Sequence, residues 1–180
     1  RFSAYLLFIT IWSLVVYSPI AHWVWGGGWL GAWGVLDFAG GTVVHIAAGT
    51  AAAVGAIVVG QRRDYGRRAF LPHNVPMMLI GTALLWFGWL GFNGGSALGM
   101  NGSAVVALVN TVLAPMATLA VWLTLDLVRT RHATAVGAGT GIVVGLVAIT
   151  PACGFVSPLG ALAIGAISAF PSYFAIAKRA

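Results

Sequence analysis

The sequence predicts an all-α integral membrane protein, and three observations lead to this fold class. Only 7% of the residues are charged and 60% are hydrophobic, whereas soluble domains carry about 25% charged residues. Six apolar runs follow one another along the chain, and a membrane-spanning helix needs about 20 mostly apolar residues. All the basic residues fall on one side if these runs cross the bilayer in alternating directions. We therefore expect a bundle of six spanning helices.

The predicted spans use most of the 180 residues and leave room only for short connections. We expect them at 2–20, 38–60, 76–92, 104–127, 135–149 and 159–177, within one membrane domain over 1–180. The connection after the first span contains four of the eight tryptophans, Trp23, Trp25, Trp29 and Trp33. Indole rings favour the membrane interface, so this connection is expected at a membrane surface.

The second and third spans begin with recognisable residues. Asp37 stands directly before the second span, where a carboxylate would cap the helix and face the positive end of its dipole. Ala48, Ala52 and Ala56 then repeat at intervals of four, which lets another helix or a narrow pore approach the backbone closely. The third span begins at Pro76, where the missing N–H of a proline costs nothing.

The later spans carry packing signals. Pro115 in the fourth span predicts a kink. Gly137, Gly141 and Gly145 are four residues apart in the fifth span and indicate a close helix-packing seam. The single cysteine, Cys153, follows that span; it excludes an internal disulfide and is expected to be a small buried residue.

The basic residues predict the orientation in the membrane. They lie at Arg1, at 62–68, at Arg129 and Arg131, and at 178–179. The connections at 20–36, 93–103 and 150–158 contain none. By the positive-inside rule, loops 61–68 and 128–132 are expected on the cytoplasmic side of a plasma or inner membrane. The net charge of +6 is then explained by topology, and no nucleic-acid partner is expected.

Asp37 and His45 are the residues most able to carry chemistry. Asp37 is interpreted either as a helix cap or as part of a cation path, and the two interpretations are compatible. His45 follows eight residues later, roughly 12 Å further along a helix that rises 1.5 Å per residue. A lone histidine in a soluble core usually only packs, but inside a membrane an ionisable group is a functional candidate. No other histidine of this chain is expected at a comparable depth.

Trp89, Phe92 and Ser96 would share one helix face, since they occupy positions i, i+3 and i+7. The pattern alone is explained by packing, and Gly94 and Gly95 are equally compatible with a break in the helix. The sequence shows no nucleophile and no set of metal ligands, so neither an enzyme nor a cofactor is expected.

Five motifs, found in order along the chain, closely resemble those of the ammonium transporter (Amt/Mep/Rh) family. They lie at 21–28 (AHWVWGGG), 37–46 (DFAGGTVVHI), 72–74 (PHN), 88–96 (GWLGFNGGS) and 150–154 (TPACG). The resemblance implies eleven spanning helices in an inverted repeat, assembled as a homotrimer with a separate pore in each subunit. This chain looks like helices four to nine, so we expect it to be a piece of a longer protein.

The resemblance implies roles for four residues at the outer half of the pore. Trp25 and Ser96 match an external recruitment site, where an indole face attracts the cation and a hydroxyl accepts its hydrogen bond. Phe92 matches one of two gate phenylalanines, and Trp89 matches a pore-lining tryptophan beneath it. The second gate phenylalanine and a further aromatic residue of the recruitment site would lie outside this chain.

The resemblance also implies roles deeper in the pore. Asp37 matches an aspartate needed for conduction and for the local fold, and His45 matches the first of two pore histidines. The second histidine would lie outside this chain. The implied function is transport of ammonium or ammonia through a hydrophobic pore, in which the ion gives up its proton and histidines relay it.

Two alternative functions remain open from the sequence. One is an ammonium sensor, in which the same membrane domain is fused to a cytoplasmic signalling domain. The other is a Rh-like gas channel, although Trp25 and Ser96 at the recruitment positions favour ammonium. Family members are also blocked by PII-type signalling proteins on the cytoplasmic face. The 62–68 loop is expected on that face, but topology already explains its charge.

Overall fold

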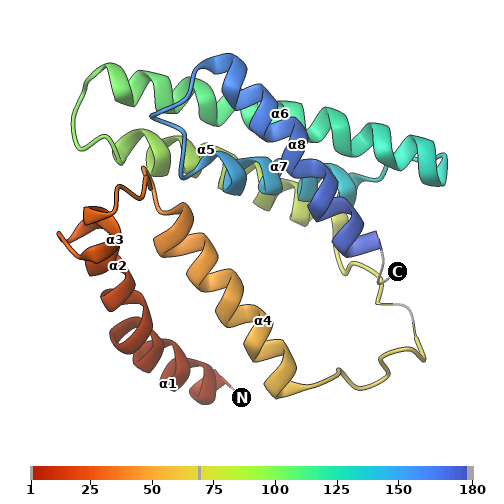
Figure 1. Ribbon diagram of the computed structural model, residues 1–180. Coiled ribbons are helices and arrows are strands. Elements are labelled where there is room, and N and C mark those ends of the chain that lie inside the picture. The colour runs from red at the N-terminus through yellow and green to blue at the C-terminus, as the bar shows by residue number, and fades with distance from the viewer. Residues whose placement is uncertain (1, 69, 178–180) are drawn as a thin grey trace.

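The chain folds almost entirely into helices in a computed structural model that describes residues 2–68 and 70–177 (Figure 1). No strand occurs within these two ranges. The elements are α1 (Phe2–Trp12), η1 (Ser13–Tyr17), α2 (Ser18–Trp25), α3 (Trp29–Ala32), η2 (Gly41–Ile46), α4 (Ala47–Val59), α5 (Val75–Gly95), α6 (Gly102–Thr130), α7 (Ala135–Ile149) and α8 (Pro158–Ala177), where η marks a π-helical turn. The predicted all-α membrane fold class is confirmed.

Five helical segments are long and apolar enough to cross a membrane. They are Phe2–Ala32, Gly41–Val59, Val75–Gly95, Gly102–Thr130 and Pro158–Ile176. Helix α7 is also apolar but has only 15 residues. At 1.5 Å per residue it extends about 22 Å, less than the roughly 30 Å hydrocarbon core. It therefore does not cross a full bilayer by its own length.

Two of the expected helix boundaries are wrong. The first helical segment does not end at residue 20 but continues through α2 to Trp25, because a π-helical turn precedes Pro19 and accommodates it. The hydroxyl of Ser18 donates a hydrogen bond to the Ser13 carbonyl across that turn, at 2.8 Å. The second segment begins at Gly41 rather than at residue 38, because the preceding residues form the loop described below.

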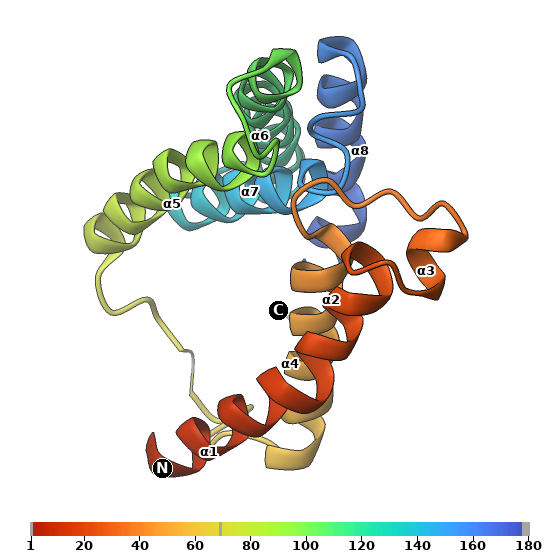
Figure 2. The same cartoon turned by 90° about the vertical axis from the view of Figure 1, so that its left-hand side faces the viewer.

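Helices α5 to α8 form the packed part of the molecule (Figures 1 and 2). A buried cluster of small and aliphatic residues lies among these helices and the segments that precede η2 and α8: Ala39, Ala107, Ala114, Ile149, Cys153 and Ala161. Polar side chains connect the same elements, since the hydroxyl of Thr118 in α6 donates to the Gly165 carbonyl of α8 at 2.7 Å. Small residues and such interhelical hydrogen bonds let membrane helices pack closely.

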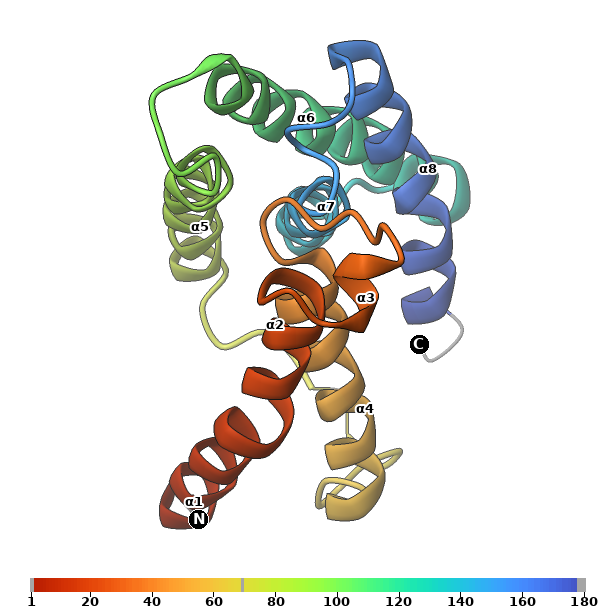
Figure 3. The same cartoon turned by 60° about the vertical axis from the view of Figure 1, so that its left-hand side comes forward.

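Helix α1 with α2 and helix η2 with α4 extend away from this packed part (Figure 3). Near their upper ends η2 contacts both α2 and α7. The far end of α4 is exposed and apolar, with Ile57, Val58 and Val59 each about four-fifths accessible, at 81%, 79% and 84%. Such a surface suits lipid tails or further apolar helices rather than water.

Candidate functional site

The Asp37 carboxylate binds the first backbone N–H groups of η2. One oxygen, Oδ1, accepts from Gly40 at 2.9 Å and Gly41 at 2.6 Å, and Oδ2 accepts from Thr42 at 2.9 Å and Val43 at 3.0 Å. The residue is only 6% exposed. These are donors that a helix start otherwise leaves unpaired, and the positive end of the helix dipole adds to the attraction.

The position of the cap differs from the expectation. Gly40, not Asp37, is the N-cap residue, and its φ of 106° lies in the left-handed region that glycine tolerates. A β-carbon at Gly40 would also overlap the Val44 side chain. Asp37 therefore reaches the helix start from three residues before the cap.

The segment around Asp37 is attached to two other parts of the molecule. The indole Nε1 of Trp25, from the end of α2, donates to the Asp37 carbonyl at 2.8 Å. The Phe38 N–H donates to the Pro151 carbonyl at 3.0 Å, and the Phe38 ring meets Phe155 edge-on at 5.3 Å between ring centroids. The structure thus places Trp25 and Asp37 together, a link that no sequence spacing indicated.

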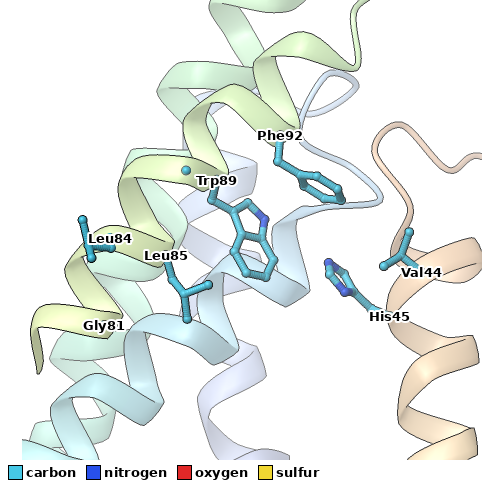
Figure 4. A pocket seen from close by; sticks show the side chains of 8 residues that line it. Val44, His45, Gly81, Leu84, Leu85, Trp89 and Phe92 are labelled. Atoms are coloured by element: carbon cyan, nitrogen blue, oxygen red, sulfur yellow. The ribbon is translucent and has the colours of Figure 1, made fainter. Parts of the chain in front are cut away.

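Three aromatic rings from two elements meet beneath this loop (Figure 4). The His45 ring of η2 stacks on the Trp89 indole of α5, with centroids 5.3 Å apart and planes inclined by 28°. Phe92 lies 6.1 Å from His45 and contacts Trp89 edge-on at 5.8 Å. The His45 Nε2 atom is buried and has no hydrogen-bond partner among the described residues.

These rings line a cavity of about 580 Å³ between η2 and α5. Its walls consist of Val44, His45, Gly81, Leu84, Leu85, Gly88, Trp89 and Phe92. Figure 4 shows the His45 ring pointing across the cavity towards Trp89 and Phe92. The cavity is apolar apart from the imidazole, so an uncharged molecule enters it at far lower cost than a bare ion.

Ser96 lies at the end of α5, which continues through Gly94 and Gly95 without the break that was considered. The Ser96 hydroxyl donates to the Phe92 carbonyl at 2.8 Å, one helical turn earlier. Phe92, Trp89 and Ser96 therefore belong to one continuous helical segment. Trp25 is 47% exposed, and within the described ranges no hydrogen bond or ring contact joins it to Ser96.

Two residues at this site were not identified from the sequence. Thr150 accepts a hydrogen bond from the Trp89 indole Nε1 at 2.9 Å, and Pro151 accepts the one from Phe38 described above. Trp89 and Thr150 are 61 positions apart, so only the packing of α5 against α7 brings them together. The fold and the site thus define a multi-pass membrane protein with an apolar, histidine-containing cavity.

Comparison with known proteins identifies the family, and the chain belongs to it: the model of the Ammonium Transporter Family matches residues 1–180. An ammonium transporter of Aquifex aeolicus is 51% identical, over 98% of this chain and 41% of its own length. Mep2 of Candida albicans is 42% identical with a TM-score of 0.85, over 91% of this chain and 37% of its own. A sensor Amt protein is 38% identical with a TM-score of 0.84, over 89% of this chain and 43% of its own.

These matches confirm the resemblance seen in the motifs, and the family consists of transporters rather than enzymes. The chain spans only about two fifths of the length of these relatives.

Proposed function

We propose that the protein to which this chain belongs transports ammonium or ammonia across a membrane, and that the cavity between η2 and α5 is part of its pore. The observation that carries the proposal is the His45 imidazole, which lies in an otherwise apolar cavity against the Trp89 ring. An ionisable group at such a place is costly and marks a transport path in membrane proteins. Membership of the ammonium transporter family supports the substrate.

The first step of the proposed mechanism is recruitment of the cation at Trp25 and Ser96. The partly exposed Trp25 indole offers a π face to ammonium, and its N–H is already engaged by the Asp37 carbonyl. The Ser96 oxygen keeps acceptor capacity while its proton is donated to Phe92. The Asp37 charge lies behind this mouth and attracts cations towards it.

The second step is loss of the proton before the cavity is crossed. Carrying a bare charge past Phe92 and Trp89 would be expensive, because the lining offers no polar group to replace water. Ammonia is neutral and passes more easily. The neutral His45 imidazole donates one hydrogen bond and accepts another, so it relays the proton. Its unpaired Nε2 is where a second imidazole, outside this chain, would bind.

The remaining features of the whole protein belong to the same proposal. We infer a homotrimer in a plasma or inner membrane, with loops 61–68 and 128–132 on the cytoplasmic side. A PII-type regulatory protein is a partner to be tested on that side. No cofactor takes part in this mechanism.

Two other functions are distinguished by experiment. A sensor is favoured by one observation, the 38% identity to a sensor Amt protein over 89% of this chain. A sensor would bind ammonium without a sustained flux, whereas a Rh-like channel would pass ammonia without selecting the ammonium ion.

The test is charge movement in proteoliposomes that contain the full-length protein, after a jump in external ammonium. We expect a saturating current, which His45→Ala reduces or deprives of its ammonium selectivity because the relay is lost. His132→Ala is the matched control, since His132 is exposed in the connection after α6, and it should behave as the parent. Folded trimers that bind ammonium but carry no current would contradict transport and favour the sensor.

A further inference from the structure

The motif at 150–154, which neither the pore lining nor the recruitment site includes, contacts both walls of the cavity. It forms the turn between α7 and α8. Thr150 contacts the α5 wall through its side chain, and Pro151 contacts the η2 wall through its ring and its carbonyl. Thr150 is fully buried and neither residue lines the cavity.

The contact with the α5 wall is a single well-oriented hydrogen bond. The Thr150 hydroxyl donates its proton to the Leu146 carbonyl at 2.7 Å. Its oxygen is thereby oriented to accept, and it receives the Trp89 indole N–H at 2.9 Å. A donor bound at one edge of a rigid ring system limits how the ring can tilt. Thr150 therefore holds the indole face against which His45 stacks.

The contact with the η2 wall combines a hydrogen bond and a close packing contact. The Pro151 carbonyl accepts the Phe38 N–H at 3.0 Å. The Pro151 ring occupies the space that a β-carbon on Gly41 would need. Gly41 also donates its N–H to Asp37 and begins the turn that ends at Ile46. Pro151 thus sets the position of the loop and of the helix start from which His45 projects.

The turn itself is held from the opposite side by α6. The Asn110 amide donates to the carbonyls of Cys153 and Val156, each at 2.8 Å. Asn110 and Cys153 are fully buried, so these bonds are shielded from competition with water. The turn is therefore a rigid support and not a mobile loop.

We propose that Thr150 and Pro151 form a positioning bracket that fixes the Trp89 indole relative to the His45 imidazole and the Asp37 loop. The two walls face each other through aromatic rings, and no hydrogen bond joins η2 directly to α5 within the described ranges. Their relative placement depends on the two adjacent residues that contact both. This inference rests on the proposed function, because its consequence for activity is the geometry of the transport path.

The test uses the full-length protein with Thr150→Val, which keeps the shape but removes the acceptor, and Thr150→Ser, which keeps the hydroxyl. We expect Thr150→Val to lower the maximal ammonium current about tenfold with little change in KM, because the unpaired indole N–H lets the ring shift. Thr150→Ser should stay within about twofold of the parent, since a hydroxyl still pairs with the indole.

Thr140→Val is the matched control. Thr140 lies on the same helix and donates the same kind of hydrogen bond, to the Val136 carbonyl at 2.8 Å, but it accepts none from an indole. It should leave the current and KM unchanged.

A second readout reports the geometry without relying on transport. The protein is labelled with 5-fluorotryptophan, and the Trp89 fluorine resonance is assigned by its loss in Trp89→Phe. We expect Thr150→Val to shift or broaden this resonance and Thr150→Ser to restore it. In the Trp89→Phe background, Thr150→Val should cause no further loss of current, because the bond it removes is already absent.

The outcomes separate the bracket from the proposed function. An unmoved Trp89 resonance in a folded Thr150→Val protein would overturn the bracket, as would equal loss of current in the valine and serine variants. If the parent protein carries no ammonium current at all, the proposed function fails. A shift in the valine variant that serine reverses would then still support the bracket as the device that orients Trp89.

Discussion

Four backbone N–H groups converge on one buried carboxylate at Asp37, and this residue illustrates how a functional candidate can also be structural. The carboxylate satisfies the start of η2, and the Asp37 carbonyl holds the Trp25 indole. A single residue therefore connects the mouth of the proposed pore with the helix that carries His45. Loss of its charge would affect conduction and local folding together.

Replacing Asp37 with asparagine should destabilise the protein. The amide keeps one acceptor oxygen, so about two of the four N–H groups lose their partner. Each buried donor left unpaired costs about 1–3 kcal/mol, and we expect the free energy of unfolding to fall by about 2–5 kcal/mol. The measurement is unfolding of the purified full-length protein in mixed micelles.

Asp64→Asn is the control for the loss of one negative charge. Asp64 lies exposed in the 61–68 loop, where surface substitutions usually change stability by less than about 0.5 kcal/mol. Equal stability of the Asp37 and Asp64 variants would contradict a structural role for the Asp37 carboxylate.

At the scale of elements, the contact between η2 and the turn after α7 depends on the absence of a side chain. The Pro151 ring lies where a Gly41 β-carbon would project. Extra atoms in a well-packed interior cost about 1–3 kcal/mol, because neighbours must move. The two elements can therefore approach this closely only with glycine at position 41.

Gly41→Ala should lower both the thermal stability and the ammonium current of the full-length protein, since the η2 wall must move away from Pro151. Adding Pro151→Ala should recover part of the stability, because it makes room while keeping the carbonyl that binds Phe38. Gly99→Ala is the control; its β-carbon would meet only the Asn101 amide nitrogen, at 3.7 Å. Additive losses in the double variant would contradict the predicted contact.

The sequence predicted the helices well and their contacts poorly. Apolar length alone located α5, α6, α7 and α8 within a few residues, because a spanning helix needs a long apolar run. The start of η2 was missed, since the left-handed conformation of Gly40 and the reach of Asp37 depend on the folded loop. His45 and Trp89 could be singled out, but their stacking and the Thr150 bond depend on tertiary packing.

At the scale of the whole molecule, the packing within this chain is uneven. Helices α5 to α8 share buried contacts, whereas α1 and α4 present long apolar surfaces. The relatives are more than twice as long as the matched region. We infer that the rest of the protein covers part of these surfaces and supplies the opposite wall of the cavity.

The proposed topology predicts which loops face each side of the membrane. The connections before and after α5 hold Arg63 and Met100, which lie at opposite ends of that spanning helix (Figure 1). In a Cys153→Ala background, we expect Met100→Cys to react with an impermeant maleimide from outside sealed cells. Arg63→Cys should react only after the membrane is opened, because the basic loop faces the cytoplasm. Labelling of both from the same side would contradict this topology.

The π-helical turn of η2 has a consequence for how this segment can change. His45 lies eight positions after Asp37, and the turn of Gly41–Ile46 lies between the two side chains. Each residue added to or removed from a helix rotates everything after it by about 100°. A one-residue deletion here would shorten the segment slightly but swing the imidazole towards a different side of the helix. The number of residues between the carboxylate and the histidine therefore encodes a direction, and the ring reaches the cavity only at that count.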